Sequence, residues 1–211
     1  MDIVVIGTGG LAREFYSFFS NEVNIIGFSS TNTTEFDNFA LRGEFFGSNI
    51  TPAVVGTNQA VLAIGSPNAK RAVSEKLKIL GFEFPNLVHS SAISATNLSE
   101  STSEGVIISP NCVIGSNVNF AKHIYLNFMV GVGHNTTFES YIQVNPGVQI
   151  GGAVLVEEGV LIGSGSTIRQ GLKLKKASTV GSGSVVLSPV REGITVLGNP
   201  AKRLKTPSLN E

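Results

Sequence analysis

An apolar residue recurs at every sixth position through the central stretch of this chain, and the phase is never broken. The repeat runs through fourteen positions, which are Ile108, Ile114, Phe120, Leu126, Val132, Phe138, Val144, Ile150, Val156, Ile162, Ile168, Leu174, Val180 and Val186. Because 42% of all residues are apolar, such a run has a chance probability on the order of 10⁻⁵. A period of six suits neither a helix nor a flat strand. It predicts a parallel β-helix in which each hexapeptide forms one wall of a triangular coil.

The composition agrees with a solenoid of this kind. The chain has 24 glycines and no tryptophan. Tight corners favour glycine, and a narrow interior has no room for an indole ring. Three hexapeptides complete one coil, so residues eighteen apart should stack at about the 4.8 Å spacing of neighbouring strands.

Charge and cysteine content narrow the functional classes. Lys plus Arg and Asp plus Glu each number 15, and no long basic run occurs, which disfavours nucleic acid or an anionic membrane as a partner. Cys112 is the only cysteine, so an internal disulfide is excluded, and no Cys/His cluster resembles a zinc site. The N-terminus reads as a strand and not a signal peptide, and no apolar stretch is long enough to span a bilayer. We expect a cytoplasmic protein.

The first 85 residues follow a different pattern, in which short apolar runs alternate with helical periodicity. Strands are predicted at Asp2–Ile6, Val23–Phe28, Val54–Val55 and Ala60–Ile64, and helices at residues 11–19 and 67–80. Residues 29–52 are polar and weakly patterned. This alternation predicts a small α/β unit with a parallel sheet.

The hexapeptides take over near residue 86, and Pro189–Lys205 leaves the repeat and should cap the open end of the solenoid. We therefore expect an N-terminal domain at 1–85, a β-helix domain with its cap at 86–205, and a tail at 206–211.

A glycine-rich loop joins the first predicted strand to the first predicted helix. Residues 7–12, GTGGLA, fit the GxGxxA pattern that brings backbone amides and a helix N-terminus against a phosphate, although a simple tight turn has the same spacing. The acidic residue that would hold a cofactor ribose is replaced by Ser29 and Ser30, which disfavours NAD and leaves a nucleotide diphosphate possible. Gly65, after another strand, borders the same crevice.

The chain has three histidines, His89, His123 and His134, and the repeat singles out the last one. Its position, two residues after the inward-facing Val132, stacks it on Ser116 below and Gly152 above. A histidine base beside an exposed glycine N–H suits acyl transfer, in which the base accepts the nucleophile's proton and the N–H binds the carbonyl oxygen. The alternative is an ordinary corner with an exposed imidazole.

Small residues follow many of the apolar positions and read mostly as corners. They are Ser109, Gly115, Ala121, Gly133, Gly151, Gly163 and Gly181. Glycines on the outer wall at 163, 165, 181 and 183 would also leave a groove for an extended ligand.

Together these motifs resemble a known family. The segments VVIGTGGLARE, AIGSPNAKR, NLVHSSA, LNFMVGVGHNTTF, PGVQIGG and VLGNPAKRLK, with the hexapeptides between them, resemble the hexapeptide-repeat acyltransferases of the sialic acid O-acetyltransferase and nucleotide-sugar N-acetyltransferase group. The resemblance covers nearly the whole chain. It implies a Rossmann-like N-terminal domain followed by a left-handed β-helix, assembled as a homotrimer with active sites between subunits.

The resemblance also implies roles for individual residues. His134 falls on the catalytic base, Gly152 on the glycine whose amide receives the thioester carbonyl, and Asn127 on a polar position of the same site. Gly7, Gly9 and Gly10 would lie near the phosphates of a nucleotide-linked sugar, and Gly65 near its base. Acetyl-CoA would be the co-substrate, its path running along Gly163, Gly165, Gly181, Ser182, Ala201 and Lys202.

The chain departs from this family's pattern at several positions. Asn135 stands where an acidic residue usually follows the catalytic histidine, and an amide orients imidazole without stabilising imidazolium as a carboxylate does. Leu11 and Gln143 stand where histidines often lie near the sugar. Ser29 and Ser30 replace an acidic pair, which leaves the identity of the nucleotide open.

The sequence thus predicts an acetyl-CoA-dependent N-acetyltransferase acting on a nucleotide-activated amino sugar, such as a 4-amino-4,6-dideoxy sugar, in surface-polysaccharide or glycan biosynthesis. The alternatives are O-acetylation of a sialic acid or another sugar and, from a different class, a non-catalytic β-solenoid scaffold. An ice-binding wall would need regular threonine rows, and a metal site like that of carbonic anhydrase would need three converging histidines. The sequence disfavours both.

Overall fold

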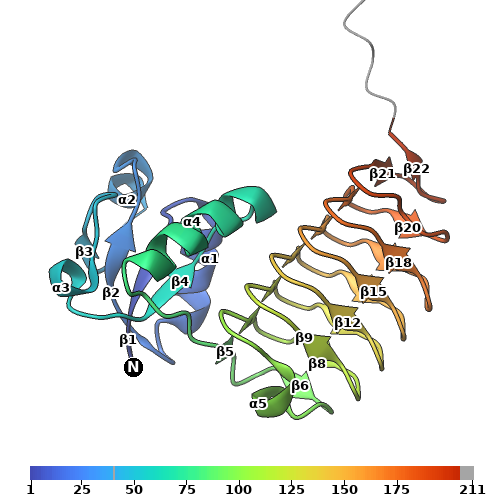
Figure 1. Cartoon of the computed structure of the whole chain (residues 1–211), viewed down its shortest axis with the longest axis horizontal. Coiled ribbons are helices and arrows are strands. Elements are labelled where there is room, and N and C mark those ends of the chain that lie inside the picture. The colour runs from blue at the N-terminus through green and yellow to red at the C-terminus, as the bar shows by residue number, and fades with distance from the viewer. Residues whose placement is uncertain (40, 205–211) are drawn as a thin grey trace, which may run out of the picture.

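The computed structural model describes residues 1–39 and 41–204, so the predicted tail at 206–211 lies outside the described residues. Figure 1 shows an α/β domain beside a long triangular coil, and the coil axis leads away from the α/β domain. The helices are α1 (Gly10–Phe19), α2 (Thr34–Asn38), α3 (Pro52–Val55), α4 (Pro67–Ile79) and α5 (Leu98–Ser101).

The N-terminal domain is built on one parallel sheet. Its strands among the described residues are β1 (Asp2–Ile6), β2 (Asn24–Ser29), β3 (Glu44–Phe45) and β4 (Ala60–Leu62). They are ordered β3-β2-β1-β4 and all run parallel, so β2 and β3 are added on one side of β1 and β4 on the other, and the strand order reverses beside β1. In such sheets, ligands bind at the carboxyl ends of the strands next to this reversal.

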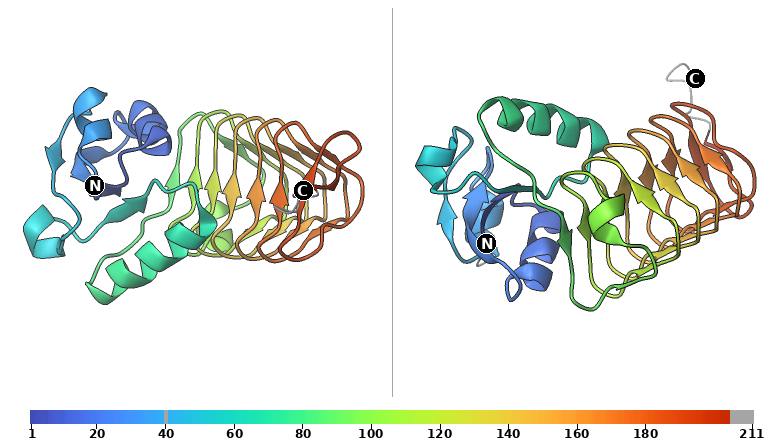
Figure 2. Two further views of the ribbon diagram at one scale, coloured as in Figure 1. Left: turned by 90° about the horizontal axis from the view of Figure 1, so that it is seen from above. Right: turned by 60° about the horizontal axis from the view of Figure 1, so that its bottom comes forward.

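Alternate side chains of β1 pack against helices on opposite faces of this sheet. Ile3 and Val5 share an apolar cluster with Phe15 of α1, whereas Val4 shares one with Leu77 of α4. The two helices therefore sandwich the sheet (Figure 2). The predicted α/β unit is confirmed.

The predicted strand at Val54–Val55, just after the weakly patterned region, is wrong. These two valines belong to α3, a single helical turn. The Thr51 side chain accepts from the Val54 N–H, Pro52 occupies the first turn, and Gly56 ends the helix in the left-handed region at φ 77°. These local stop and start signals outweigh the β propensity of two valines.

The remaining strands form the β-helix. Among the described residues they make three walls. The first wall contains β5 (Leu87–Val88), β7 (Ile107–Ile108), β10 (Tyr125–Leu126), β13 (Gln143–Val144), β16 (Leu161–Ile162), β19 (Thr179–Val180), β21 (Thr195–Leu197) and β22 (Lys202–Arg203). The second wall contains β6 (Ile93–Ser94), β8 (Val113–Ile114), β11 (Gly131–Val132), β14 (Gln149–Ile150), β17 (Thr167–Ile168) and β20 (Val185–Val186). The third wall contains β9 (Asn119–Phe120), β12 (Thr137–Phe138), β15 (Leu155–Val156) and β18 (Lys173–Leu174).

The strand register confirms the eighteen-residue coil. Leu126 pairs with Val144, Val132 with Ile150, and the same offset joins the strands of the third wall. All fourteen period-six positions lie in one buried core. A second inward row, two residues earlier in each hexapeptide, completes this core; it includes Val106, Cys112 and Val118.

The corners of the coil do not lie where the sequence analysis placed most of them. From Ile108 to Val180, the residue with positive φ comes three positions after the apolar site, not one, as at Asn111, Asn135 and Gly165. The small residue one position after the apolar site has another cause. A Cβ at Gly163 would lie 2.5 Å from the Ser182 nitrogen, because the backbone of the next coil passes directly over it.

Apolar contacts join the N-terminal domain to the first wall. Outward-facing Leu87, Ile107 and Tyr125 of this wall belong to the same cluster as Phe15 and Phe19 of α1. The predicted boundary at residue 85/86 falls just before β5, the first strand that pairs within the wall.

A buried lysine on α4 reinforces the junction. Lys70 is 2% exposed, and its Nζ donates to the Gln143 side-chain oxygen at 3.2 Å and to the Ile142 carbonyl at 3.4 Å. Burial lowers the pKa of Lys70 to about 7 from its ordinary 10.5. Both partners are neutral acceptors, so the contact is compatible with an uncharged amine.

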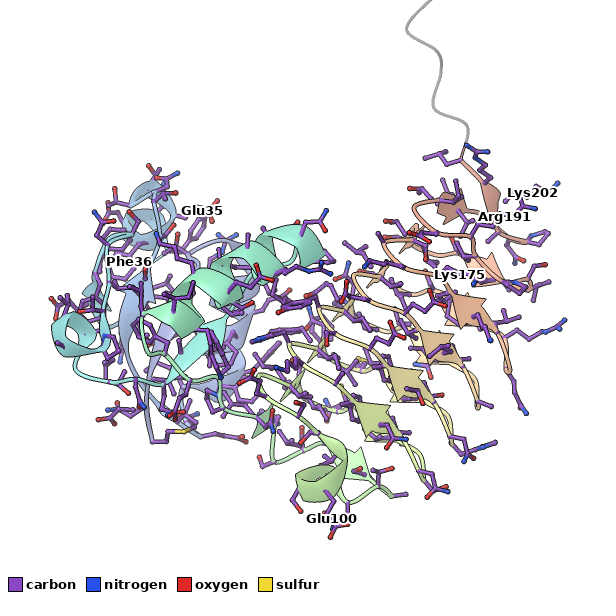
Figure 3. All side chains as sticks on the ribbon, viewed as in Figure 1. Glu35, Phe36, Glu100, Lys175, Arg191 and Lys202 are labelled. Atoms are coloured by element: carbon purple, nitrogen blue, oxygen red, sulfur yellow. The ribbon has the colours of Figure 1, made fainter. Side chains whose placement is uncertain are left out.

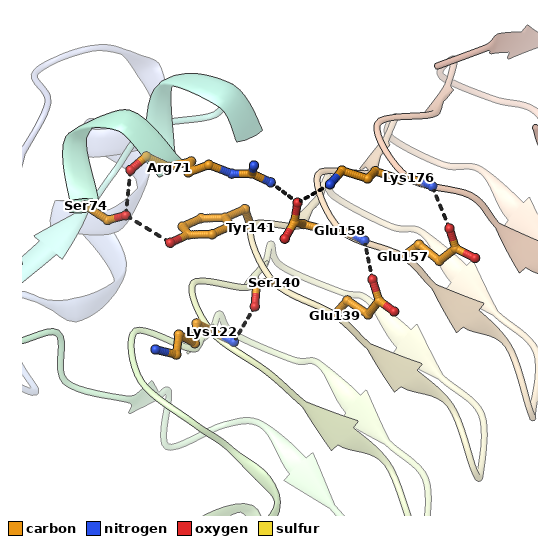
Figure 4. Close-up of polar contacts among 9 residues, drawn as sticks. All are labelled: Arg71, Ser74, Lys122, Glu139, Ser140, Tyr141, Glu157, Glu158 and Lys176. Carbon is orange, nitrogen blue, oxygen red and sulfur yellow. Dashed lines mark hydrogen bonds and ion pairs between the residues drawn. The ribbon is translucent and has the colours of Figure 1, made fainter. Parts of the chain in front are cut away.

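Arg71 and Ser74, further along α4, add contacts to the edge between the third and first walls (Figure 4). Arg71 pairs with Glu158, which also pairs with Lys176 at 3.0 Å, and Ser74 donates to the Tyr141 hydroxyl at 3.4 Å. These contacts fix α4 over several coils, so the two domains form one continuous body around this helix.

We expect Lys70 to make stability depend on pH. The folded-state pKa lies below the unfolded value, so between about pH 7 and 10.5 the unfolded chain holds a proton that the folded chain lacks. The free energy of unfolding should rise with pH across this window, by at most about 1.4 kcal/mol per unit from this group. Urea titrations should show the rise in the wild type and a flatter curve for Lys70→Met. Lys76→Met, an exposed change on the same helix, is the control. Parallel curves for the wild type and Lys70→Met would contradict the assignment.

Candidate active site

His134 and Asn135 occupy the turn between the second and third walls, and both side chains are exposed. Asn135 adopts the left-handed region at φ 59°, which asparagine tolerates better than most residues. Its side-chain oxygen lies 2.8 Å from Nδ1 of His134. An amide oxygen can only accept, so Nδ1 carries the proton and Nε2 keeps its lone pair.

Gly152 lies directly against this imidazole, one coil further along. A Cβ at Gly152 would lie 2.6 Å from Nε2 and 2.8 Å from Cε1, so only glycine leaves room for the ring. The Ala153 N–H donates to the His134 carbonyl at 2.7 Å and fixes the two coils in register. Among the described residues, the Gly152 N–H has no backbone acceptor. The predicted stacking of these two residues is confirmed, and their catalytic role stays a prediction.

The other two histidines belong to the junction between the domains. Burial lowers the pKa of His123 to about 4, and its ring lies between Phe84 and Tyr141. His89 contacts Phe19 with ring centroids 5.6 Å apart and lies 3.5 Å from Glu22. His134 alone of the three is exposed on the β-helix, away from the N-terminal domain.

The sequence predicts a nucleotide crevice at the carboxyl ends of β1, β2 and β4, and its role stays a prediction. A cavity of about 580 Å³ opens there, and its lining includes Gly7, Ser29, Ser30, Asn49, Thr51 and Lys76. Ser29 is buried and donates to the Gly47 carbonyl at 2.7 Å. Asn49, Thr51 and Lys76 were missed by sequence reasoning, because the first two lie in the weakly patterned stretch and the third looks like an ordinary exposed helix residue. Gly65 follows β4 and Ile64, which borders this cavity.

Charged side chains flank the glycine loop itself. Gly9 and Gly10 begin α1, and their Cβ positions would lie 3.7 Å from Glu35 Oε2 and 3.6 Å from Arg13 Nη2. The Glu35 oxygen is buried without a hydrogen-bond partner among the described residues. The loop therefore has a cation and a carboxylate beside it, neither of which the sequence analysis placed there.

Asn127 lies at a different edge of the prism from His134. It follows β10, in the turn between the first and second walls, and is 3% exposed. Its Nδ2 donates to Oε2 of Glu14, on α1, at 2.9 Å, and its Oδ1 accepts from the Phe128 N–H. Glu14 was missed by sequence reasoning, since nothing in the sequence shows that α1 docks against this turn.

The residues expected along the coenzyme path lie on the same edge as Asn127. Gly163 and Gly181 stack above it at intervals of eighteen residues, and Gly165 has open space at its Cβ position. Ser182 follows Gly181, whereas Ala201 and Lys202 belong to the C-terminal cap. Figure 3 shows Lys202 at the end of the β-helix remote from the N-terminal domain.

Within one copy, the second wall separates this edge from His134. A single chain therefore does not bring the predicted coenzyme path and the predicted base together.

Gln143, predicted near the sugar, lies instead under α4. Besides accepting from Lys70, its amide donates to Asn145 Oδ1 at 3.2 Å, and the residue is 1% exposed. The structure thus places it in the junction between domains, and its role at a sugar stays a prediction.

No helix in residues 1–39 and 41–204 has the length and apolar character to cross a membrane. In the same ranges, no group of three or more His, Cys, Asp or Glu side chains is placed to hold a metal ion.

No protein-family model matches this sequence, and no curated protein matches it. Solved structures match along nearly the whole chain. The acetyltransferase domain of PglB from Neisseria gonorrhoeae is 23% identical with a TM-score of 0.82, and the match covers 96% of this chain and 99% of that one. A histidine-to-asparagine variant of perosamine N-acetyltransferase from Caulobacter crescentus, in complex with CoA and GDP-perosamine, is 20% identical with a TM-score of 0.83 over 98% of each chain.

WeeI from Acinetobacter baumannii is 21% identical with a TM-score of 0.77, covering 97% of this chain and 100% of that one. At these identities the likeness establishes the fold. The predicted combination of a Rossmann-like domain and a left-handed β-helix is confirmed, and the resemblance seen in the sequence is confirmed at the level of the fold.

We expect Asn135 to determine which tautomer the neutral His134 imidazole adopts. Asn135→Ala removes the acceptor at Nδ1, so neutral His134 should shift toward the Nε2–H tautomer, which long-range ¹H–¹⁵N NMR spectra distinguish. Asn135→Asp keeps an acceptor and should keep the Nδ1–H form. An Nε2–H tautomer in the wild type would contradict the geometry.

Proposed function

We propose that this chain is an acetyl-CoA-dependent N-acetyltransferase acting on the amino group of a nucleotide-activated amino sugar, such as a 4-amino-4,6-dideoxy sugar, in surface-polysaccharide or glycan biosynthesis. The observation that carries the proposal is the contact of His134, whose Nδ1 faces the Asn135 side-chain oxygen, with Gly152 one coil above, whose N–H has no backbone acceptor among the described residues. The fold that holds this pair is also the fold of perosamine N-acetyltransferase. We expect the protein to act in the cytoplasm.

The crevice of the N-terminal domain supports a nucleotide-linked substrate. Its cavity has room for a base and ribose beside Ser29 and Ser30, and Gly65 lies at the same strand ends. In the glycine loop the Gly7 N–H donates to the Ser29 carbonyl at 2.8 Å, whereas the N–H groups of Thr8 and Gly9 have no backbone acceptor among the described residues and are left for a diphosphate. Arg13 beside Gly10 adds a positive charge. The Glu35 carboxylate would have to move away when the phosphates bind.

The edge between the first and second walls supports the path for acetyl-CoA. Gly165 has open space at its Cβ position, and Ser182 adds a hydroxyl, whereas the Leu197 side chain lies against Gly181. Lys202, exposed on the cap further along, offers a cation to the phosphates at the nucleotide end, with Ala201 next to it.

An uncovered apolar surface supports assembly as a homotrimer. On and beside the second wall, Ile93, Val113 and Met129 are 67%, 52% and 59% exposed. Such side chains on neighbouring coils mark an interface better than isolated exposed residues do. Three copies packed through their second walls would place the His134 edge of one copy beside the Asn127 edge of the next. The active site would then be complete only between subunits.

The mechanism follows from these positions. His134 Nε2 accepts a proton from the sugar amine as its nitrogen bonds to the thioester carbon, and the Gly152 N–H stabilises the negative charge on the carbonyl oxygen. When the carbon–sulfur bond breaks, His134 returns the proton to the departing thiolate. Asn135 holds the ring in the required tautomer but does not stabilise its cation as a carboxylate would, which suits an amine better than a less nucleophilic hydroxyl.

The test is acetyl transfer itself. Incubation of the protein with acetyl-CoA and nucleotide-linked amino sugars should yield an amide, located by mass spectrometry. His134→Ala should lower kcat by about 100-fold or more while acetyl-CoA still binds. An ester on a sialic acid or another sugar hydroxyl would show an O-acetyltransferase instead. Absence of saturable CoA binding would favour a scaffold, and near wild-type turnover of His134→Ala would remove this residue from the mechanism.

Shared active sites predict recovery of activity in mixed assemblies. Gly9→Glu should block the diphosphate loop and His134→Ala the base, so each variant alone should be inactive. When the two are co-expressed and mix randomly, about a quarter of the sites should combine an intact crevice with an intact histidine from a neighbouring copy. Activity near that fraction of the wild type is the expected result. No recovery in verified mixed trimers would place the whole site within one copy.

A further inference from the structure

One face of α1 lies along the Asn127 edge of the β-helix. Gly10, Glu14 and Phe18 are four residues apart and therefore share this face. The Phe18 ring meets Phe128 edge-on with centroids 5.7 Å apart, and Glu14 Oε2 accepts from Asn127 Nδ2 at 2.9 Å. The turn after β10 is thus held against α1 by one apolar contact and one polar contact.

The negative charge on this face is not neutralised within the described residues. Asn127 is the hydrogen-bond partner of the Glu14 carboxylate, and no Lys, Arg or His among them forms an ion pair with it. A carboxylate can accept about four hydrogen bonds, so capacity remains for a cationic donor. Glu14 is also partly exposed, unlike Asn127.

The neighbourhood of Glu14 is deeply buried on its β-helix side. Tyr125 is 1% exposed and Ser109 0% exposed, and neither hydroxyl has a hydrogen-bond partner among the described residues. Burial raises the pKa of Tyr125, and the negative charge of Glu14 raises it further. Glu14 is therefore close enough to the β-helix for its charge to act on the buried Tyr125 hydroxyl.

The position of Glu14 relative to the glycine loop gives this charge a use. Glu14 is one helical turn beyond Gly10, about 6 Å along the axis of α1. A sugar whose diphosphate is anchored at the start of the helix would extend over this turn. Leu11 supplies no polar group there, so Glu14 is the first charged side chain on the face that lies against the β-helix.

We propose that Glu14 recognises the amino group of the sugar, by pairing with its ammonium form, and so selects an amine over a hydroxyl as the acetyl acceptor. This inference rests on the proposed function and assigns the recognition of the amino group to one residue. Glu14 would bind the substrate and not transfer protons. The ammonium first loses one proton to water; the resulting amine then attacks the thioester, and its second proton passes through His134 to the thiolate, so the products are the amide and free CoA.

The decisive change removes the charge and keeps the contact between α1 and the β-helix. In Glu14→Gln the side-chain oxygen can still accept from Asn127 Nδ2, so the docking of α1 is preserved. Glu22→Gln is the matched control, because Glu22 accepts from the Ser90 N–H at 2.9 Å and also joins the N-terminal domain to the β-helix, but beyond the far end of α1.

Binding is measured by calorimetry on the full chain in the presence of CoA. The probes are a UDP-linked 4-amino-4,6-dideoxyhexose, its 4-hydroxyl counterpart and UDP, with the GDP-linked set as a second series. The wild type and Glu22→Gln should bind the amino sugar about tenfold more tightly than the hydroxyl sugar at pH 7. Glu14→Gln should lose this preference, with its affinity for the free nucleotide unchanged.

Each other outcome is informative. A preference that persists in Glu14→Gln would overturn the role of Glu14 and leave the proposed function intact. Failure of the wild type to bind any of these nucleotides would overturn the proposed function, and this inference with it. If Glu14→Gln does not fold, Glu14→Asp replaces it. This variant keeps the charge on a shorter side chain and should retain a reduced preference for the amine; a full or absent preference would count against the proposal.

Discussion

The parallel hydrogen-bond ladder between coils is the constraint on which the rest of this structure depends. From β7 to β20, paired strands are eighteen residues apart, so a residue is positioned by its neighbours one coil below and one coil above. The pairing of His134 with Gly152 is an instance of this rule, and so is the column that leads from Asn127 to Gly181. No long-range loop has to be placed to bring these residues into contact. The relative positions of these residues are fixed by the regular strand register of the β-helix.

What could be predicted from the sequence follows from that regularity. The phase of the apolar residues sets the coil, and the coil sets which residues stack, so the neighbour of His134 could be named before any coordinates were available. The second inward row and the left-handed corners escaped notice because serine, threonine, asparagine and alanine share those rows with valine and glycine. Turn positions defined by backbone angle leave a weak signal in composition.

The contacts between the domains could not be predicted in the same way. Nothing in the sequence indicates that Lys70 is buried against Gln143 or that Glu14 reaches Asn127, since these pairs are 73 and 113 residues apart and belong to different repeat rules. A lysine and a glutamate on amphipathic helices look like solvent-exposed residues until the partner surface is known. Both helices that cover the N-terminal sheet therefore have a second role, which is to orient the cavity of the N-terminal domain relative to the solenoid.

The left-handed corners also lower the stability of the chain where their residues carry a Cβ. Asn117, Asn135, Ala153 and Gly171 occupy equivalent corners of successive coils. The left-handed conformation costs a residue with a Cβ about 1 kcal/mol, less for asparagine and nothing for glycine. Alanine has no polar group to offset that cost, so substitution of Ala153 or Ala177 by glycine would remove the strain and raise the free energy of unfolding. At Asn135 the same exchange would remove the hydrogen-bond partner of the His134 imidazole. That corner therefore has a second requirement beyond its backbone conformation.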